Sequence, residues 1–186
     1  ATGRLGFSRH LEVWEIVAQV AQLRRESSFP VRGVVFMGMG EPLLNLDAVL
    51  QAARIFSEPC GLAISAKAIT LSTVGIVPAI LRLARERQPY RLIVSLTSAD
   101  PDKRRRVMPV EARYPLSTLR DALAAYHAAT GRRMTLAWTL IAGFNTSEED
   151  AQQLADWVGE LPVQLDLIDV NDATGRFAPP DDAERN

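Results

Sequence analysis

Cysteine and histidine are scarce in this sequence of 186 residues, which has one cysteine, Cys60, and two histidines, His10 and His127. A single thiol cannot form an internal disulfide. It also cannot by itself hold a zinc ion or an iron–sulfur cluster, because both need several thiolate or imidazole ligands. We therefore expect any metal ligands to lie outside this chain, which begins at Ala1 without a methionine and is interpreted as an internal fragment of a longer protein.

Long hydrophobic runs are also missing. No apolar stretch approaches the roughly 18 residues of a membrane-spanning helix, since Gly40, Glu41 and Pro42 interrupt the most hydrophobic segment. The first residues do not show the charged and then apolar order of a signal peptide. With one thiol and no export signal, the sequence predicts a cytoplasmic protein with no membrane partner.

Charge of one sign does not dominate, because 21 Lys and Arg residues face 22 Asp and Glu residues, for a formal net charge of −1. This balance excludes the positive potential over a whole domain that is typical of a stand-alone nucleic-acid-binding module. The dense basic run is Lys103, Arg104, Arg105 and Arg106. It is either a solvated surface or a contact for phosphates, and the sequence leaves both interpretations open.

Apolar residues make up 47% of the chain, which is enough to bury the core of one compact domain over residues 1–186. Their spacing alternates between the periods of helices and of buried strands. The pattern predicts five helices: three at about 11–25, 46–57 and 76–87, one that contains Leu119, Leu123 and Tyr126, and one that begins after residue 146. It predicts strands at 33–37, 68–72, 92–96, 134–141 and 163–168. Asn45 is the expected cap of the second helix. Thr146 and Glu149 have the spacing of a capping box for the last helix.

Five strands that alternate with helices predict an α/β fold with parallel strands and right-handed crossovers. Periodicity alone does not decide whether such a sheet closes, half closes or stays open. In either a β/α barrel or a doubly wound sheet, the chemistry gathers at the carboxyl ends of the strands. Those ends are therefore the place to look for a site.

Every predicted strand has polar residues or glycine at its carboxyl end. They are Gly38, Gly40 and Glu41 after the first strand, Ser72 and Ser95 at the second and third, Asn145 after the fourth, and Asp169 and Asn171 after the fifth. Glycines let a ligand approach the backbone closely, and the Glu41 carboxylate can accept hydrogen bonds. The same run also fits a tight turn between a strand and a helix, and serines are common turn residues.

No activated nucleophile can be assembled from these residues. His10 is near a helix start and His127 near a helix end, so neither is placed as a base for Ser72 or Ser95. Cys60 follows a helix, toward the opposite edge, and is expected to be an inert, packed thiol. The residues alone thus predict a small-molecule site of backbone, hydroxyl, amide and carboxylate groups that lacks a catalyst of its own.

Five motifs resemble those of the radical S-adenosylmethionine (SAM) RNA methyltransferases of the RlmN/Cfr family. The matching segments are GMGEPL with Asn45 in residues 35–45, ITLSTVGIVP in residues 69–78, Ser95-Leu96 with Arg104 to Pro109, Gly143-Phe144-Asn145, and Leu167-Ile168 with Asn171. They follow one another in the family's order and cover nearly the whole chain.

The resemblance implies a partial (β/α)6 radical SAM barrel whose first strand and cluster loop are absent from this chain. It implies a 4Fe-4S cluster with ligands just upstream of Ala1, a methyl-carrying cysteine downstream, and an electron donor. It further implies a monomer that methylates an adenine of ribosomal or transfer RNA, while this fragment alone is inactive. With RNA as the substrate, the basic run Lys103, Arg104, Arg105 and Arg106 becomes the candidate RNA contact. The residues that the resemblance places around SAM are Gly40, Glu41, Ser72, Ser95, Leu96, Thr97 and Asn171.

Two positions depart from the family pattern. Thr97 stands where the family usually has histidine, and Asp169 stands where it usually has proline. Asp169 adds negative charge to an edge that would receive RNA phosphates, so the departure bears on the methyl acceptor more than on the cofactor. Two alternatives therefore stay open: a divergent radical SAM enzyme with a non-RNA acceptor, and a cofactor-binding module without catalysis.

Overall fold

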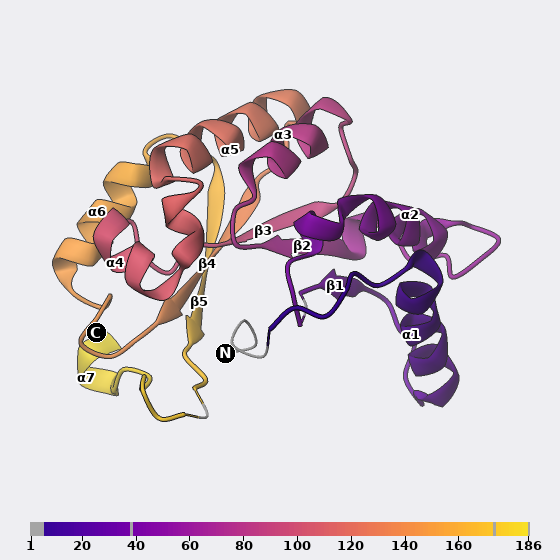
Figure 1. Ribbon diagram of the computed structural model, residues 1–186, viewed down its shortest axis with the longest axis horizontal. Helices are drawn as coiled ribbons and strands as arrows, with labels where there is room; N and C mark the ends of the chain where they lie inside the picture. The colour runs from indigo at the N-terminus through magenta and orange to yellow at the C-terminus, as the bar shows by residue number, and fades with distance from the viewer. Residues whose placement is uncertain (1–5, 38, 173, 186) are drawn as a thin grey trace. The chain divides into compact units, whose positions relative to one another are not determined.

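The computed structural model describes residues 6–37, 39–172 and 174–185 (Figure 1). Within it the chain forms two compact units. The first comprises Ala1–Thr73 and Gln88–Leu92, and the second comprises Val74–Arg87 and Ile93–Asn186. The assignment of the whole chain to one domain stays a prediction.

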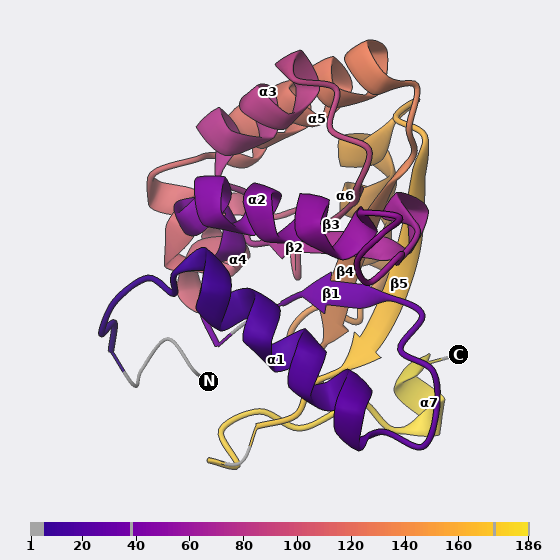
Figure 2. The ribbon, with the colours of Figure 1, turned by 90° about the vertical axis from the view of Figure 1, so that its right-hand side faces the viewer.

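The first unit contains two parallel strands and two packed helices. Its elements are α1 (Val13–Glu26), β1 (Val34–Phe36), the 3-10 helix η2 (Pro42–Asn45), α2 (Leu46–Ser57), the 3-10 helix η3 (Ala66–Ala68) and β2 (Ile69–Thr73). Val34 pairs with Ile69 and Phe36 with Leu71. The helices α1 and α2 lie against each other (Figures 1 and 2). Phe56 of α2 is fully buried, as are Ile69 and Leu71 of β2, so this face of α2 and strand β2 form the core of the unit.

The second unit contains the rest of the parallel strands. Its elements are α3 (Val77–Arg85), most of β3 (Arg91–Ser95), α4 (Pro101–Val107), the 3-10 helix η4 (Pro109–Ala112), α5 (Leu116–Thr130), β4 (Met134–Leu140), α6 (Glu148–Val158), β5 (Val163–Asp169) and α7 (Asp182–Arg185). Strand β4 pairs in parallel with β3 and with β5. Helices α3 and α5 pack side by side (Figure 1). Leu119, Leu123 and Tyr126 of α5 are buried, as their spacing predicts.

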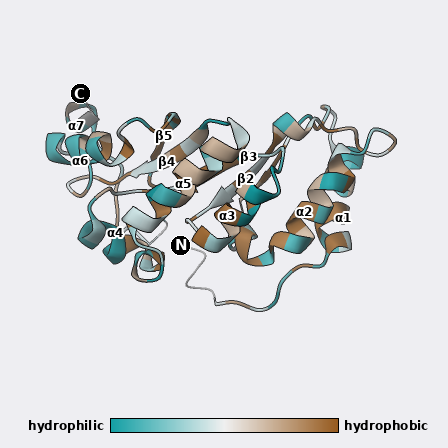
Figure 3. Ribbon diagram, turned by 90° about the horizontal axis from the view of Figure 1, so that it is seen from above, coloured by the Kyte–Doolittle hydropathy of each residue, from teal (hydrophilic) through white to brown (hydrophobic). Residues whose placement is uncertain are grey.

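The alternation of strands and helices and the parallel pairing confirm the α/β fold class. Figure 3 shows that α2 carries both hydrophobic and hydrophilic residues, whereas α4 and α6 are mainly hydrophilic. Within the described residues, no helix combines the length and the hydrophobicity of a transmembrane segment.

Two local predictions differ from the structure. Asn45 lies at the cap position of α2 but forms no side-chain cap; its Nδ2 donates to the Leu11 carbonyl at 2.8 Å instead. The capping box of α6 is one residue later than predicted and is formed by Ser147 and Asp150. These two positions have the same spacing as Thr146 and Glu149, so residue types alone do not separate the two registers.

Helix α4 is not among the predicted helices, because its short, highly charged sequence has no apolar periodicity from which to predict it. Its start is nevertheless marked by residues that favour a helix N-terminus. Pro101 occupies the first turn, and the Asp100 carboxylate accepts hydrogen bonds from the amides of Asp102 and Lys103. The cap at Asp100 stabilises the start of the helix that contains the basic run. In a helix, successive side chains point in different directions, so the four basic side chains do not share one face.

Candidate functional site

In the first unit, the structure brings Gly40, Glu41 and Ser72 to the same edge. Gly40 and Glu41 follow β1, and Ser72 comes directly after Leu71, which pairs with Phe36 near the end of β1. Because β1 and β2 are parallel, their carboxyl ends meet at one edge. Gly38, the other glycine of this segment, lies outside the described residues.

Gly40 and Glu41 form the turn between β1 and η2. Gly40 has φ +150°, a backbone conformation that favours glycine, while a Cβ there would meet no atom within 4 Å. The Glu41 carboxylate accepts a hydrogen bond from the Leu43 amide at 2.9 Å. Glu41 thus stabilises the turn through one oxygen, which means that its carboxylate is held in a defined position at the strand edge.

Ser72 lies within β2, all five residues of which are buried. The exposed fraction of Ser72 is 8%. Its surroundings are therefore those of a packed strand, and any ligand would reach it from the carboxyl end of the strand.

In the second unit, Ser95 and Asn171 both belong to the carboxyl ends of strands, but they lie at different heights along the strand direction. Ser95 ends β3 and pairs with Ala137 of β4, which in turn pairs with Asp166 of β5. Strand β5 continues three residues beyond that level to Asp169, which is about 10 Å at the rise of a strand. Asn171 follows this extension and is exposed. The register therefore does not place Asn171 level with Ser95.

Leu96, Thr97 and Ser98 form a strained turn at the end of β3. The Leu96 amide donates to the Ala137 carbonyl at 2.9 Å, and the Ser98 amide donates back to the Leu96 carbonyl at 2.7 Å. The second bond closes a γ-turn around Thr97, which has φ +61°. This region is rare for a β-branched residue and costs on the order of 1–3 kcal/mol. Leu96 is fully buried, and both its amide and its carbonyl are used in these two bonds, so the structure shows no free group of Leu96 for a ligand.

Asn145 connects this turn with β4. Its Nδ2 donates to the carbonyls of Thr97 at 2.6 Å and of Thr139 at 2.7 Å. Its Oδ1 accepts from the Ile141 amide at 2.8 Å, and its exposed fraction is 2%. The sequence identifies Asn145 as a strand-end polar residue but does not predict its bond to Thr97. An asparagine directly after Gly143-Phe144 is the available signal.

The basic run divides into one buried arginine and three more accessible side chains. Arg104 is 0% exposed; it forms an ion pair with Glu111 at 2.5 Å and donates to the Val74 carbonyl at 2.9 Å. Burial lowers the pKa of Arg104, and the hydrogen bond to Glu111 opposes this effect. The expectation that Arg104 contacts RNA is therefore corrected, because its guanidinium is enclosed and neutralised by the fold.

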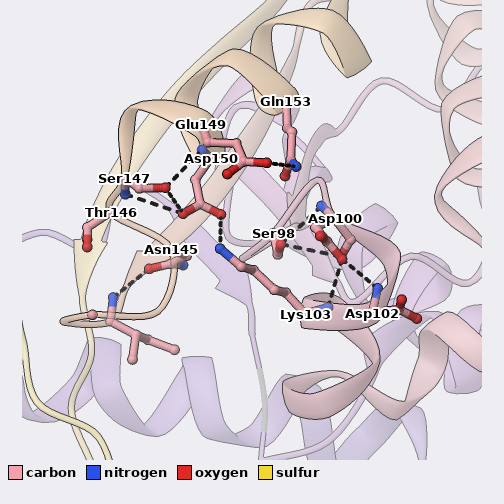
Figure 4. A network of polar contacts seen from close by, with 12 residues as sticks. Ser98, Asp100, Asp102, Lys103, Asn145, Thr146, Ser147, Glu149, Asp150 and Gln153 are labelled. Atoms are coloured by element: carbon pink, nitrogen blue, oxygen red, sulfur yellow. Dashed lines mark hydrogen bonds and ion pairs between the residues drawn. The ribbon is translucent and has the colours of Figure 1, made fainter.

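The other three basic side chains have partners that leave them at least partly accessible. Lys103 pairs with Asp150 at 2.7 Å (Figure 4). Arg105 pairs with the exposed Asp102 at 3.1 Å, and the Arg106 guanidinium lies 5.3 Å from the centre of the Phe144 ring. Exposed pairs of this kind are weak, so Arg105 and Arg106 stay available for a phosphate.

Asp150 is 2% exposed and joins α4 to α6. Burial alone would raise the pKa of Asp150, but hydrogen bonds from Lys103 and Ser147 outweigh it and hold that pKa below its usual range. The folded protein thus binds a proton at Asp150 less readily than the unfolded chain. The resulting stabilisation is present at neutral pH and is lost as the pH falls through the lowered pKa.

The described residues do not fit an iron–sulfur cluster. Among them, no group of three or more His, Cys, Asp or Glu side chains is placed to hold a metal ion. Cys60 is exposed in the segment between α2 and η3, which corrects the expectation of a packed thiol. A 4Fe-4S cluster would need thiolates that this segment does not supply.

Each unit also has a groove that the sequence does not indicate. One of about 730 Å³ runs between α1 and α2 and is lined by Leu11, Trp14 and Ile55 among others. Another of about 330 Å³ lies beside Lys103 and Asp150. Neither groove is lined by a residue that the resemblance places around SAM.

Comparison with known proteins gives matches along the chain. Residues 2–158 match the family model described as the Radical SAM superfamily. A probable RNA methyltransferase from Anaeromyxobacter sp. (strain Fw109-5) is 51% identical over 186 residues, covering 100% of this chain and 55% of the relative. A dual-specificity RNA methyltransferase RlmN from Syntrophobacter fumaroxidans is 43% identical over 176 residues, covering 94% of this chain and 51% of the relative.

A solved structure gives the same result for the fold. A radical SAM methyltransferase from Sphaerobacter thermophilus matches with a TM-score of 0.93 at 38% identity, over 98% of this chain and 55% of that one. The chain spans about half the length of the relatives it matches. The resemblance to RlmN-type proteins is confirmed by relatives of that name. On the family match and the structural similarity together, the chain belongs to the radical SAM superfamily.

Proposed function

We propose that this chain is the core of a radical SAM enzyme that methylates an adenine base of ribosomal or transfer RNA. The observation that carries the proposal is the 51% identity, over the whole chain, to a protein named as a probable RNA methyltransferase. The carboxyl ends of the strands support it, because both units carry there the residues that the resemblance assigns to SAM. The working enzyme is a cytoplasmic monomer that also needs an electron donor.

SAM and a 4Fe-4S cluster held by cysteines outside this chain supply the radical chemistry when they are bound. The part of the present residues is to bind and orient the cofactor. Gly40 and Glu41 offer backbone and a carboxylate, and Ser72 and Ser95 offer hydroxyl groups at their strand ends. Asn171 offers an amide beyond β5.

A radical SAM enzyme with a non-RNA acceptor is the second candidate. It is favoured by Asp169, which ends β5, is exposed, and brings negative charge to the carboxyl edge of the second unit. A carboxylate at that position repels RNA phosphates at close range.

The two candidates are separated by following the methyl group. The full-length protein, reconstituted anaerobically, is incubated with methyl-labelled SAM, a reductant and total RNA, and the RNA is digested to nucleosides. Label in methyladenosine is the expected result. Cleavage of SAM without labelled RNA would favour the non-RNA acceptor. Binding of SAM without its cleavage would indicate a cofactor-binding module without catalysis.

RNA binding by the exposed part of the basic run is tested by its salt dependence. Replacing both Arg105 and Arg106 by alanine should lower the slope of log affinity against log salt by about 0.7 to 0.9 for each phosphate that these arginines neutralise. Arg133→Ala is the matched control, because Arg133 is also exposed but lies just before β4, at the opposite end of that strand. Fluorescence anisotropy across a salt series measures the slope, and equal slopes in all three proteins would contradict the assignment.

A further inference from the structure

We propose that Asn145 is a positioning residue that holds the Leu96–Ser98 turn in the conformation that binds SAM. The inference rests on the proposed function, because it takes the segment from Ser95 to Thr97 as part of the SAM site. It assigns to Asn145 no contact with SAM itself. The role follows from the strain in the turn and from the hydrogen bonds that oppose the strain.

The turn is a conformation that Thr97 does not favour by itself. Thr97 has φ +61°, and the hydrogen bond from the Ser98 amide to the Leu96 carbonyl closes the turn around it. Residues in such a region persist where the surrounding structure holds them, and they gather at ligand sites. A rotation about the N–Cα bond of Thr97 would relieve the strain. Because the Leu96 amide is bonded to the Ala137 carbonyl of β4, this rotation would move the Thr97 carbonyl, so the position of that carbonyl is the point that needs to be held.

Asn145 holds that carbonyl through a short hydrogen bond of 2.6 Å from Nδ2. Its other Nδ2 hydrogen is used by the Thr139 carbonyl at 2.7 Å, and its Oδ1 is used by the Ile141 amide at 2.8 Å. Both of those partners belong to the end of β4 or follow it directly. The amide is therefore fixed to β4 on two sides, and this anchoring transmits the rigidity of the strand to the turn.

The buried surroundings make the contact specific for an asparagine. Asn145 and Thr97 are 2% and 7% exposed, so water is largely excluded from taking the place of the Asn145 donor. Among the described residues, Asn145 is the side chain that donates to the Thr97 carbonyl. An aspartate would keep an acceptor for the Ile141 amide but would turn a carboxylate oxygen toward two carbonyl oxygens. It should therefore release the turn although its shape is nearly the same.

The experiment compares SAM affinity with folding stability in the full-length protein. Asn145→Asp and Asn145→Ala should each weaken SAM binding at least tenfold by calorimetry. Asn145→Ser, which keeps one donor and is the milder change, should have an intermediate affinity. Ser147→Ala is the matched control: it removes the cap of α6 two residues later and should lower the urea midpoint while SAM affinity stays within twofold of the wild type.

A purely structural role predicts a different result. If the Asn145 variants unfold at lower urea but bind SAM as tightly as the wild type when folded, the proposal is wrong. If the wild-type protein itself does not bind SAM, the proposed function fails and this inference fails with it. The two failures are distinguished by the wild-type measurement.

Rescue by glycine tests the mechanism directly. Glycine adopts φ near +60° without the penalty that threonine has. With Thr97→Gly, the turn should therefore depend less on the hydrogen bond from Asn145 to the carbonyl of residue 97. Adding Thr97→Gly to Asn145→Ala should recover at least threefold in SAM affinity, whereas Thr97→Gly alone should not improve binding. Equal effects of Thr97→Gly in both backgrounds would overturn the proposal, because they would show that the two residues act independently.

Discussion

Replacing Glu41 by alanine is expected to weaken SAM binding roughly ten- to a hundredfold in the full-length protein, at about 1.5–3 kcal/mol for each charge-assisted hydrogen bond removed. The carboxylate lies at the carboxyl edge of the first unit, directly after Gly40. Its hydrogen bond from the Leu43 amide at 2.9 Å holds it in place before a ligand arrives. Calorimetry with SAM measures the loss of affinity.

A second substitution separates the charge of Glu41 from its role in the turn. Glu41→Gln keeps an oxygen that can accept from the Leu43 amide but has no charge, so it should preserve the turn and still lose most of the affinity. Glu58→Gln is the control, since Glu58 is an exposed acid of the same unit that follows α2. Unchanged SAM affinity in Glu41→Ala would mean that residues 39–42 form only a structural turn.

Replacing Arg104 by methionine is expected to destabilise the fold by about 3–5 kcal/mol, because one partner of a buried ion pair is removed. The Glu111 carboxylate, which is 2% exposed, would keep the hydrogen bond from the Leu116 amide but would lose its counter-charge. The Val74 carbonyl would also lose the hydrogen bond from Arg104. Denaturant unfolding measures the change in the free energy of unfolding.

Replacing both partners should cost much less than replacing one. Arg104→Met combined with Glu111→Leu leaves no uncompensated charge, and it also removes the Arg104 Nε, which is buried without a partner among the described residues. Arg105→Ala is the neighbouring control and should stay within about 0.5 kcal/mol of the wild type. If Arg104→Met were no more harmful than Arg105→Ala, the ion pair would not stabilise the fold.

The strands and the helices other than α4 and α7 could be predicted from the sequence, because their signals are local. Each predicted strand is present to within two residues of its ends, and the apolar face of α5 is buried as its spacing predicts. The polar strand ends are equally local, since Glu41 and Ser95 are recognisable from the strand that precedes them. The exact residue at which a helix begins was harder to predict, because the capping box is formed by Ser147 and Asp150, one residue after the predicted pair.

What the sequence by itself determined is the alternating parallel fold, the polar strand ends and the motifs of the family. Tertiary structure alone decided that Arg104 is buried among four consecutive basic residues, and that Asn145 holds Thr97 in a strained turn. The physical reason is sequence separation. The hydrogen bond from Arg104 to Val74 joins residues 30 positions apart, and that from Asn145 to Thr97 joins residues 48 positions apart. Neighbouring side chains determine a local period, but such partners meet only after the strands and helices between them have packed.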